Sequence, residues 1–321
     1  KLLFPIVGVP LIDVMIDWLK TARVSEVILA VNHLADRLKN EIGENRSGVD
    51  VQYSIEKQPL GTGGPIRLAR KMLGSKTPFL VLNGDIVTNL DLNKMIQVHK
   101  KSQAQVTIAL VKVPDPSPYG LVQIDKDERI RSFEEKTKNI QGPGLVNAGV
   151  YVLSPEVIDR IPGEGMVSIE RQVYPILARE GLMNGWVHND GYWHDIGKIH
   201  GYMRVNRDLL ERSWRKRPGS GAQGTGPFHI GKGSRVHEEA RIGPYSILSD
   251  NVTVKAGATI NDSIVFEEAQ IDVNCHVEGP IIGERVHVGK GVRLVPGTLV
   301  AGEITIPAGR VYDRDSIILN A

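Results

Sequence analysis

Apolar residues in the first two-thirds of the chain alternate between helical and strand spacing. From Leu11 to Ala22 they recur every three or four residues, which predicts an amphipathic helix. The apolar runs Val27–Val31 and Phe79–Leu82 predict strands, and we expect the second to be a buried parallel strand. The same reasoning predicts helices at 34–42, 65–73 and 90–99 and strands at 51–55 and 105–113. This alternation is typical of an α/β fold with a doubly wound sheet.

From residue 119 to 153 the pattern is mostly strands, and helical spacing returns at 168–180 and 199–210. We therefore expect an α/β domain with a Rossmann-like, doubly wound mixed sheet over residues 1–211. A cluster of cationic residues at 212–217 is followed by Pro-Gly-Ser-Gly. Such a composition is typical of a solvated linker, which we place at 212–227.

In the last third of the chain, aliphatic residues recur every six positions, a period that fits neither a helix nor a plain strand. The two runs are Ile230, Val236, Ile242, Leu248, Val254, Ile260 and then Ile282, Val288, Leu294, Val300, Ile306. The pattern resembles the hexapeptide left-handed parallel β-helix, with one short strand per hexad and three hexads per coil. We expect this fold over 228–321. The break in register from Ile264 to Gly279 suggests a bulged or looped-out turn.

Composition excludes several classes of protein. The net charge of the 321 residues is only +2, so no electrostatic field favours nucleic acid as a partner. The single cysteine, Cys275, excludes an internal disulfide and suits a reducing compartment. No apolar stretch approaches the length of a membrane span, and no signal peptide is visible. We expect a cytoplasmic protein that binds neither nucleic acid nor membrane.

Two acidic turns and a glycine run carry the candidate chemistry. Asp85 follows the strand predicted at 79–82, and ligands of α/β sheets bind at the carboxyl ends of strands. A second acid, Asp195, lies in the segment Trp193–Gly197. Two aspartates brought together there can share Mg²⁺, which offsets the phosphate charge of a nucleotide. The glycines of Leu60–Gly64 leave backbone N–H groups accessible to a base or phosphate, although such a run is also common in a plain loop.

Six short segments stand out along the chain: Lys1–Ile6, Pro59–Gly64, Asn83–Asp85, Phe133–Lys136, Asn147–Tyr151 and Gly191–Gly197. In this order, followed by the hexads, they resemble the sugar-nucleotide pyrophosphorylases, the nucleotidyltransferases that join a sugar 1-phosphate to a nucleoside triphosphate. The resemblance covers essentially the whole chain. Ala30–Asn32 and Ser168–Arg171 are most similar to the mannose-1-phosphate guanylyltransferase branch.

The resemblance implies a direct in-line displacement, in which the sugar phosphate attacks the α-phosphorus and pyrophosphate leaves. It implies that Asp85 and Asp195 hold Mg²⁺. It implies that Gly61 and Thr62 read the base, and that Glu135 and Asn147 bind the sugar hydroxyls. Lys136 would bind the sugar phosphate and Lys1 the reacting phosphates. Gly84 and Gly149 would make further contacts with the substrates. A carboxylate accepts hydroxyl hydrogen bonds and an ammonium suits a phosphate, although Glu135-Lys136 could also form an exposed ion pair.

The family opens with a strand and a glycine-rich loop that ends in Thr-Arg, whereas this sequence begins at the lysine that closes that motif. We expect these residues to lie upstream of Lys1. If they are truly absent, the alternative is a non-catalytic regulatory or scaffolding subunit that binds a sugar nucleotide. Which base and which sugar are used stays open, with glucose or N-acetylglucosamine 1-phosphate and uridine or thymidine nucleotides as alternatives to guanine with mannose.

The hexapeptide domain is expected to assemble the protein as a homo-oligomer. Hexapeptide acyltransferases resemble this domain and need a catalytic histidine at a subunit interface. Four histidines are available for such a role: His229, His237, His276 and His287. Nothing in the sequence distinguishes one of them, so acyl transfer is the weaker alternative.

Overall fold

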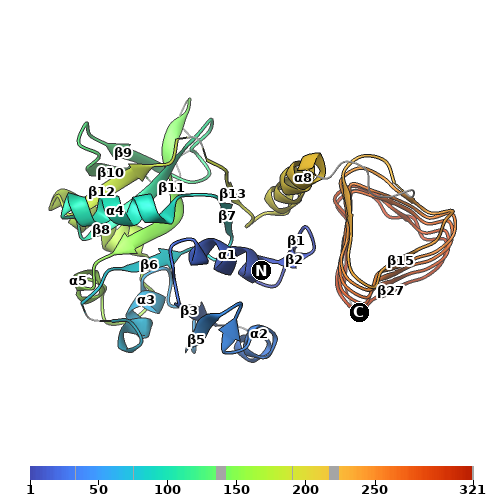
Figure 1. The fold of residues 1–321 in the computed structure, drawn as a ribbon, viewed down its shortest axis with the longest axis horizontal. Helices are drawn as coiled ribbons and strands as arrows, with labels where there is room; N and C mark the ends of the chain where they lie inside the picture. The colour runs from blue at the N-terminus through green and yellow to red at the C-terminus, as the bar shows by residue number, and fades with distance from the viewer. Residues whose placement is uncertain (33, 75, 135–141, 190, 217–223, 320–321) are drawn as a thin grey trace. The chain divides into compact units, whose positions relative to one another are not determined.

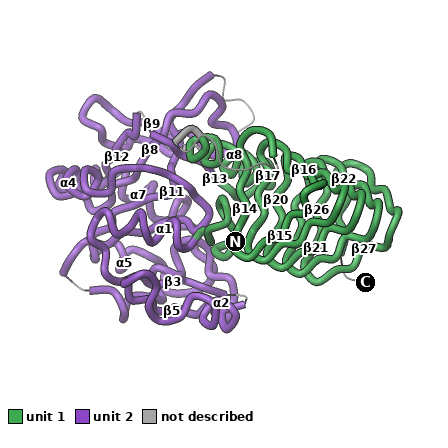
Figure 2. Tube along the Cα trace, turned by 45° about the vertical axis from the view of Figure 1, so that its right-hand side comes forward, with its two compact units in different colours: residues 1–11, 196–321 green, residues 12–195 purple. Residues whose placement is uncertain are grey.

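The computed structural model describes residues 1–319, apart from residues 33, 75, 135–141, 190 and 217–223. The chain divides into two compact units (Figure 2). One consists of residues 12–195, and the other of residues 1–11 together with 196–321. The described helices include none that is both long enough and apolar enough to cross a bilayer.

The unit of residues 12–195 is built on mixed sheets, as the sequence predicts (Figure 1). The main sheet has the strand order β12-β8-β11-β6, formed by Met183–Val187, Val106–Val113, Gly144–Leu153 and Phe79–Leu82. Strands β8 and β12 are parallel, whereas β11 runs antiparallel to both β8 and β6. A smaller sheet has the order β3-β5-β4, formed by Glu26–Val31, Val49–Ile55 and Asn45–Arg46.

Strand β6 differs from its prediction in orientation and burial. Its bounds agree with the predicted ones, but its partner is the antiparallel strand β11 and its four residues are only half-buried. The prediction of a buried parallel strand is therefore wrong. A run of four apolar residues specifies a strand but not the direction of its neighbour, which depends on how the chain returns to the sheet.

The helices of this unit largely follow the predicted positions. They are α1 Leu11–Lys20, α2 Ala35–Ile42, α3 Gly64–Leu68, α4 Leu92–Ser102, α5 Glu156–Asp159, α6 Ile169–Gln172 and α7 Tyr174–Arg179. The helix predicted at 168–180 is divided in two. Pro175 lies at the start of α7, where its missing N–H leaves no intrahelical partner unsatisfied. Four short strands complete the unit: β7 Ile86–Thr88, β9 Leu121–Ile124, β10 Ile130–Glu134 and β13 Trp193–Asp195.

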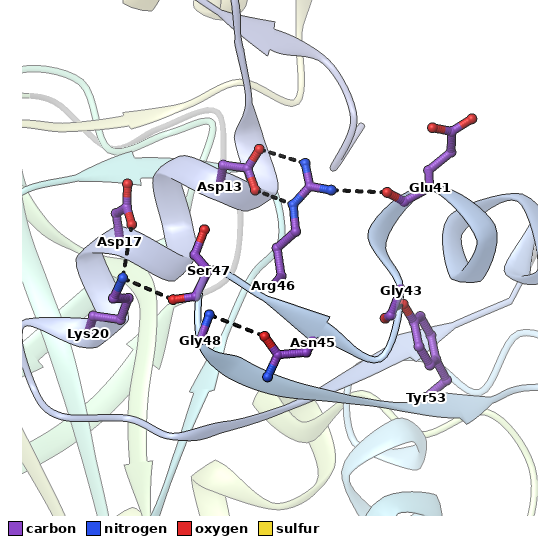
Figure 3. Close-up of polar contacts among 10 residues, drawn as sticks. All are labelled: Asp13, Asp17, Lys20, Glu41, Gly43, Asn45, Arg46, Ser47, Gly48 and Tyr53. Carbon is purple, nitrogen blue, oxygen red and sulfur yellow. Dashed lines mark hydrogen bonds and ion pairs between the residues drawn. The ribbon is translucent and has the colours of Figure 1, made fainter.

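Arg46 ties the small sheet to two helices (Figure 3). Its Nε and one terminal nitrogen donate to the two carboxylate oxygens of Asp13 on α1, at 2.6 and 2.8 Å. The other terminal nitrogen donates to the carbonyl oxygen of Glu41 on α2 at 3.1 Å. The hydrogen bond with Asp13 raises the pKa of the guanidinium against the opposing effect of burial. A bidentate pair of this kind fixes orientation as well as distance.

The second unit contains a parallel β-solenoid. Its strands stack into three sheets, with the orders β14-β17-β20-β23-β26-β28, β15-β18-β21-β24-β27 and β16-β19-β22-β25. The strands are β14 Phe228–Ile230, β15 Arg235–Val236, β16 Arg241–Ile242, β17 Ser246–Leu248, β18 Thr253–Val254, β19 Thr259–Asn261, β20 Ile264–Val265, β21 Gln270–Ile271, β22 His276–Glu278, β23 Ile281–Ile282, β24 His287–Val288, β25 Arg293–Leu294, β26 Leu299–Val300, β27 Thr305–Ile306 and β28 Ile317–Ile318. The aliphatic residues of the hexads form its core, so the reading of the six-residue period is confirmed.

The segment from Ile264 to Gly279 is not looped out, and that prediction is wrong. It forms a regular coil whose inward residues Val265, Ile271 and Val277 again lie six apart and belong to the core. In one of the three sheets, Ile230 pairs with Leu248 and Leu248 pairs with Val265. The second pair is one residue closer in the sequence than the first, so this coil is one residue shorter. The missing residue lies at the corner after β19, where Asp262 adopts a φ of 49°. A tighter corner thus shortens the coil without disturbing its core.

An N-terminal hairpin and a long helix belong to the same unit as the solenoid. Strands β1 (Pro5–Ile6) and β2 (Val9–Pro10) pair in antiparallel fashion. Helix α8 (Ile199–Lys216) continues beyond the predicted end at residue 210 and includes part of the expected linker. Its residues contact the solenoid: Arg207 Nε donates to Asp262 at 2.6 Å, and the ring centroids of Trp214 and Phe228 lie 5.1 Å apart.

Candidate active site

The two predicted metal ligands lie at the same end of a two-stranded ribbon. Strands β7 and β13 are antiparallel, and Asp195 is paired with Ile86, the residue after Asp85. Paired Cα atoms in such a ribbon are about 4.5–5.5 Å apart. The Cα atoms of the two aspartates are therefore separated by less than about 10 Å, because consecutive Cα atoms are about 3.8 Å apart. Both residues are half-buried, so their carboxylates remain accessible to a ligand.

Hydrogen bonds from neighbouring residues fix this ribbon. The backbone N–H of Tyr192 donates to Asn89 Oδ1 at 2.6 Å, and the backbone N–H of Asn89 donates to the Tyr192 carbonyl at 3.1 Å. Thr88 Oγ1 donates to the same carbonyl at 2.8 Å. The start of β13 is therefore held against the end of β7 independently of any ligand, which sets the position of Asp195.

A bulge in β11 brings the segment Asn147–Gly149 next to the acidic turn. The ladder between β11 and β8 shifts between Asn147 and Tyr151, and bulges of this kind re-aim side chains beside active sites. The Asn83 N–H donates to the Gly149 carbonyl at 2.9 Å. Gly149 has a φ of +72°, and a Cβ there would lie 2.8 Å from Asn83 Nδ2, so only glycine fits. The Asn83–Asp85 turn and the bulge thus form one connected structure.

Asn147 is partly engaged within the protein. Its Oδ1 accepts from the Gly149 N–H at 2.9 Å, and its Nδ2 donates to the Tyr151 hydroxyl at 2.8 Å. An amide has two donor hydrogens and two acceptor lone pairs, so this arrangement orients the group and leaves capacity for a substrate hydroxyl.

The glycine loop is held against the segment Val167–Glu170. A Cβ at Gly61 would lie 2.4 Å from the carbonyl oxygen of Val167, and Gly61 has a φ of +78°. The Gly63 N–H donates to that same carbonyl at 2.8 Å. The Gly63 amide is therefore used inside the protein, and the expectation that it reaches a ligand is wrong. The glycines here permit close packing of two backbones.

Glu170 is a candidate site residue that the sequence reasoning did not identify. Its Oε2 accepts from Thr62 Oγ1 at 2.5 Å and from Ser168 Oγ at 3.0 Å. Burial first, and then the charge of Glu170, raises the pKa of Tyr151. Glu170 thus contacts the glycine loop through Thr62, and its charge acts on Tyr151, the partner of Asn147. In the sequence, Ser168–Arg171 stands out only by its resemblance to the mannose-1-phosphate guanylyltransferase branch. A Glu in the first turn of a helix is common in any protein, because its charge interacts favourably with the helix dipole.

Three predicted site residues are not placed with this group. Glu135 and Lys136 lie outside the described residues. Lys1 belongs to the other unit, where its carbonyl accepts from the Phe4 N–H at 2.8 Å. Gly84 lies in the exposed turn between β6 and β7, next to Asp85.

The described residues contain no group of three or more His, Cys, Asp and Glu side chains placed to hold a metal ion. Within the described part of the chain, the aspartate pair is therefore not part of a larger cluster of this kind. Two carboxylates that leave other positions open match Mg²⁺ bound jointly by protein and substrate phosphates. The donor set thus fits the expected ion.

The histidines of the solenoid have separate local partners. His276 Nδ1 lies 3.0 Å from Thr259 Oγ1, and His287 Nε2 lies 3.2 Å from Asp272 Oδ2. His237 Nδ1 accepts from the Glu239 N–H at 3.2 Å, while burial lowers the pKa of His229. These contacts single out none of the four for acyl transfer.

Comparison with known proteins identifies the class. The profile of the nucleotidyl transferase family matches residues 1–212, and the profile described as GMPPB C-terminal domain matches residues 224–320. The chain therefore belongs to the nucleotidyl transferase family. It is a nucleotidyltransferase similar to mannose-1-phosphate guanylyltransferases.

The similarity extends over nearly the whole chain. The chain is 33% identical to a probable mannose-1-phosphate guanylyltransferase 1 of Oryza sativa subsp. japonica, over 97% of this chain and 87% of that protein. It is 31% identical to a mannose-1-phosphate guanylyltransferase of Mycobacterium tuberculosis, over 87% of this chain and 77% of that protein. The crystal structure of HddC from Yersinia pseudotuberculosis matches with a TM-score of 0.57 and 31% identity, covering 64% of this chain and 88% of that chain.

Proposed function

We propose that the protein joins mannose 1-phosphate to GTP, forming GDP-mannose and releasing pyrophosphate. The observation that carries this proposal is the pairing of Asp195 with Ile86, which brings two carboxylates to one end of the β7–β13 ribbon. The activities for which the relatives are named favour guanine and mannose over other bases and sugars. A homologue of known structure, HddC, was crystallised with GMP-PN, which is consistent with a guanine nucleotide here.

In this proposal Asp85 and Asp195 hold Mg²⁺, which when bound offsets the charge of the triphosphate. Gly61 and Thr62 contact the base, while Asn147 and Glu135 bind sugar hydroxyls. Lys136 holds the sugar phosphate so that its oxygen attacks the α-phosphorus in line with the departing pyrophosphate, and Lys1 contacts the reacting phosphates. Phosphoryl-type transfer depends on such positioning and charge neutralisation, so no protein nucleophile is required.

A matrix of GTP, UTP, dTTP and ATP against mannose, glucose and N-acetylglucosamine 1-phosphates tests the proposal. Pyrophosphate release is measured with and without Mg²⁺. We expect the highest kcat/KM for GTP with mannose 1-phosphate and no turnover after chelation of the metal. Preference for another pair would contradict the specificity, and absence of turnover with every pair would contradict the activity itself.

We also propose that the protein works in the cytoplasm as a homo-oligomer assembled through the solenoid. The last coil has large exposed apolar side chains, with Val311 67% and Ile317 65% exposed. A terminal coil also leaves strand edges that a second copy can cover. The single thiol, Cys275, is buried in the solenoid, where it needs no disulfide partner.

A further inference from the structure

The N-terminal hairpin contains a strained turn. Strands β1 and β2 are joined by Val7 and Gly8 alone, with φ values of 50° and 80°. Positive φ at both central residues is the type I′ geometry, for which Asn-Gly is the preferred sequence. A β-branched residue such as Val7 is disfavoured in this conformation. Strain of this kind persists only where the surroundings hold it in place.

Helix α8 supplies the residue that holds the turn. The Val7 N–H donates to Asn206 Oδ1 at 2.8 Å, and Asn206 Nδ2 donates to the Tyr202 carbonyl at 3.0 Å. Asn206 is only 1% exposed. A buried amide is costly unless both of its ends are hydrogen-bonded, and here one end is bonded to the strained turn. The hydrogen bond from Val7 therefore explains why a polar asparagine occupies this buried position.

A residue of the solenoid packs against the same turn. A Cβ at Gly8 would lie 2.6 Å from Nε2 of His229, a residue of the first solenoid strand β14. The imidazole thus lies directly against the glycine, and no side chain fits between them. Both residues of the turn are therefore constrained, Val7 by the helix and Gly8 by the solenoid.

A second anchor lies closer to Lys1. The Tyr202 hydroxyl donates to the Pro5 carbonyl at 2.6 Å. The ring of Phe4 lies 5.7 Å from the ring of Tyr202 and 5.7 Å from that of Phe266, which follows solenoid strand β20. The Phe4 N–H in turn donates to the Lys1 carbonyl at 2.8 Å. A continuous set of contacts therefore runs from the solenoid and α8 to the backbone of Lys1.

We infer that Asn206, Tyr202 and Phe266 are positioning residues for the segment that carries Lys1, so that the solenoid unit contributes to catalysis by holding this segment. The inference rests on the proposed function, in which Lys1 contacts the reacting phosphates. A lysine is a point charge on a flexible stem, so its backbone must be fixed for the ammonium to be placed reproducibly. Small displacements of a positioning group reduce the rate strongly.

Two variants of the intact chain test the inference against a matched control. Asn206→Leu removes the acceptor for Val7 at similar volume, and Tyr202→Phe removes the hydrogen bond to Pro5. The control is Tyr245→Phe, which removes a hydrogen bond from the solenoid to Glu211 of α8, 3.1 Å long, without touching residues 1–11. We expect each test variant to raise KM for the triphosphate and lower kcat/KM about tenfold or more, with KM for the sugar 1-phosphate little changed. The control is expected to stay within about twofold of wild type.

A second substitution in the Asn206→Leu variant distinguishes a loss of positioning from a general loss of stability. Val7→Asn creates an Asn-Gly turn that adopts the required conformation by itself. We expect it to restore much of the kcat/KM lost in Asn206→Leu. A loss that Val7→Asn does not rescue, or that affects both substrates equally, would overturn the inference.

Amide hydrogen exchange tests the anchoring even if no substrate pair is turned over. We expect the amides of residues 6–9 to exchange faster in Asn206→Leu, while the sheets of residues 12–195 keep their protection. Unchanged exchange of the hairpin would overturn the inference. Inactivity of the wild-type protein with all substrates would contradict only the proposed function.

Discussion

The indole N–H of Trp193 donates to the carbonyl oxygen of Ala148 at 2.8 Å. This hydrogen bond joins β13, which carries Asp195, to the bulge of β11, which carries Asn147. The ring of Trp193 also lies 5.4 Å from that of Tyr119 in an edge-to-face arrangement. The proposed metal side and the proposed sugar side of the site are therefore one hydrogen-bonded structure.

Trp193→Phe tests this connection. The substitution keeps an aromatic ring but removes the only donor of the indole, so we expect the free energy of unfolding to fall by about 1–2 kcal/mol. The kcat is expected to fall more than the stability alone explains, because Asp195 and Asn147 are no longer held together. Chemical denaturation and steady-state kinetics measure the two effects. A variant that loses stability but keeps wild-type kcat would show that the bond is structural only.

Asp85→Asn and Asp195→Asn test the metal site. Each replacement keeps the shape of the side chain but removes the charge that Mg²⁺ requires, so we expect turnover to be abolished and the fold retained. Activity as a function of Mg²⁺ concentration and circular dichroism are the measurements. Asp17→Asn is the matched control, because Asp17 is 69% exposed and its ion pair with Lys20, at 3.8 Å, lies at the surface. Normal turnover in either test variant would refute the assignment.

Arg46→Met tests how the small sheet is attached. The Arg46 and Asp13 side chains are 30% and 19% exposed, so solvent screens their pairing in part. We expect the free energy of unfolding to fall by about 1–2 kcal/mol, between the values for exposed and buried pairs. A double-mutant cycle with Asp13→Asn measures the coupling. A coupling energy near zero would show that the carbonyl of Glu41, and not the ion pair, provides the attachment.

The pH dependence of stability is expected to report the buried His99. Its Nδ1 lies 2.9 Å from Thr107 Oγ1 and its Nε2 lies 3.3 Å from Ser154 Oγ, and burial lowers its pKa. Because the folded state favours the neutral ring, its contribution is fully present above the unfolded pKa of about 6.5. It is lost as the pH falls from there through the lowered folded pKa.

Urea denaturation between pH 5 and 8 measures this effect. His99→Gln removes the titrating group, so the fall in stability below pH 6.5 is expected to become shallower. His229 is also buried with a lowered pKa, and the residual pH dependence is expected to decrease further when it is replaced too. An unchanged slope in His99→Gln would mean that other groups dominate the acid sensitivity.

Deletion of the chain after Arg217 tests the two roles given to the solenoid. If the solenoid assembles the protein, light scattering will report a smaller particle. Because His229 and Phe266 are removed together with their contacts to Gly8 and Phe4, we also expect a lower melting temperature and faster amide exchange at Phe4 and at residues 6–9. An unchanged particle mass would place the assembly contacts elsewhere in the chain.

The elements with strong periodicity were predicted well from the sequence. The hexad positions form the solenoid core, and α1 and β6 lie where their spacing predicts. The acidic turns were also identified correctly as features that the fold brings together, since each follows or ends a strand. For the periodic elements the signal is local, because burial of a periodic set of side chains needs no knowledge of distant residues. The pairing of the two acidic turns followed from the family resemblance.

Other features depend on the partner that a segment meets. The antiparallel neighbour of β6, the shortened coil after β19 and the use of the Gly63 amide by Val167 all involve residues far away in the sequence. Glu170 was overlooked for the same reason, since its hydrogen bond to Thr62 joins residues 108 positions apart. Nothing near Glu170 in the sequence distinguishes it from an ordinary helix-terminal acid.

The sequence by itself determined the two kinds of architecture and the positions of the glycine loop and of each acidic turn, because spacing and residue chemistry are properties of neighbouring positions. Only the tertiary structure decided that Asp195 lies opposite Ile86, that Gly149 packs against Asn83, and that Asn206 holds Val7. The physical reason is that a strand register or a buried hydrogen bond is selected by the packing of the whole unit. The packing selects one partner for each strand and each buried polar group, whereas the local sequence is compatible with many partners.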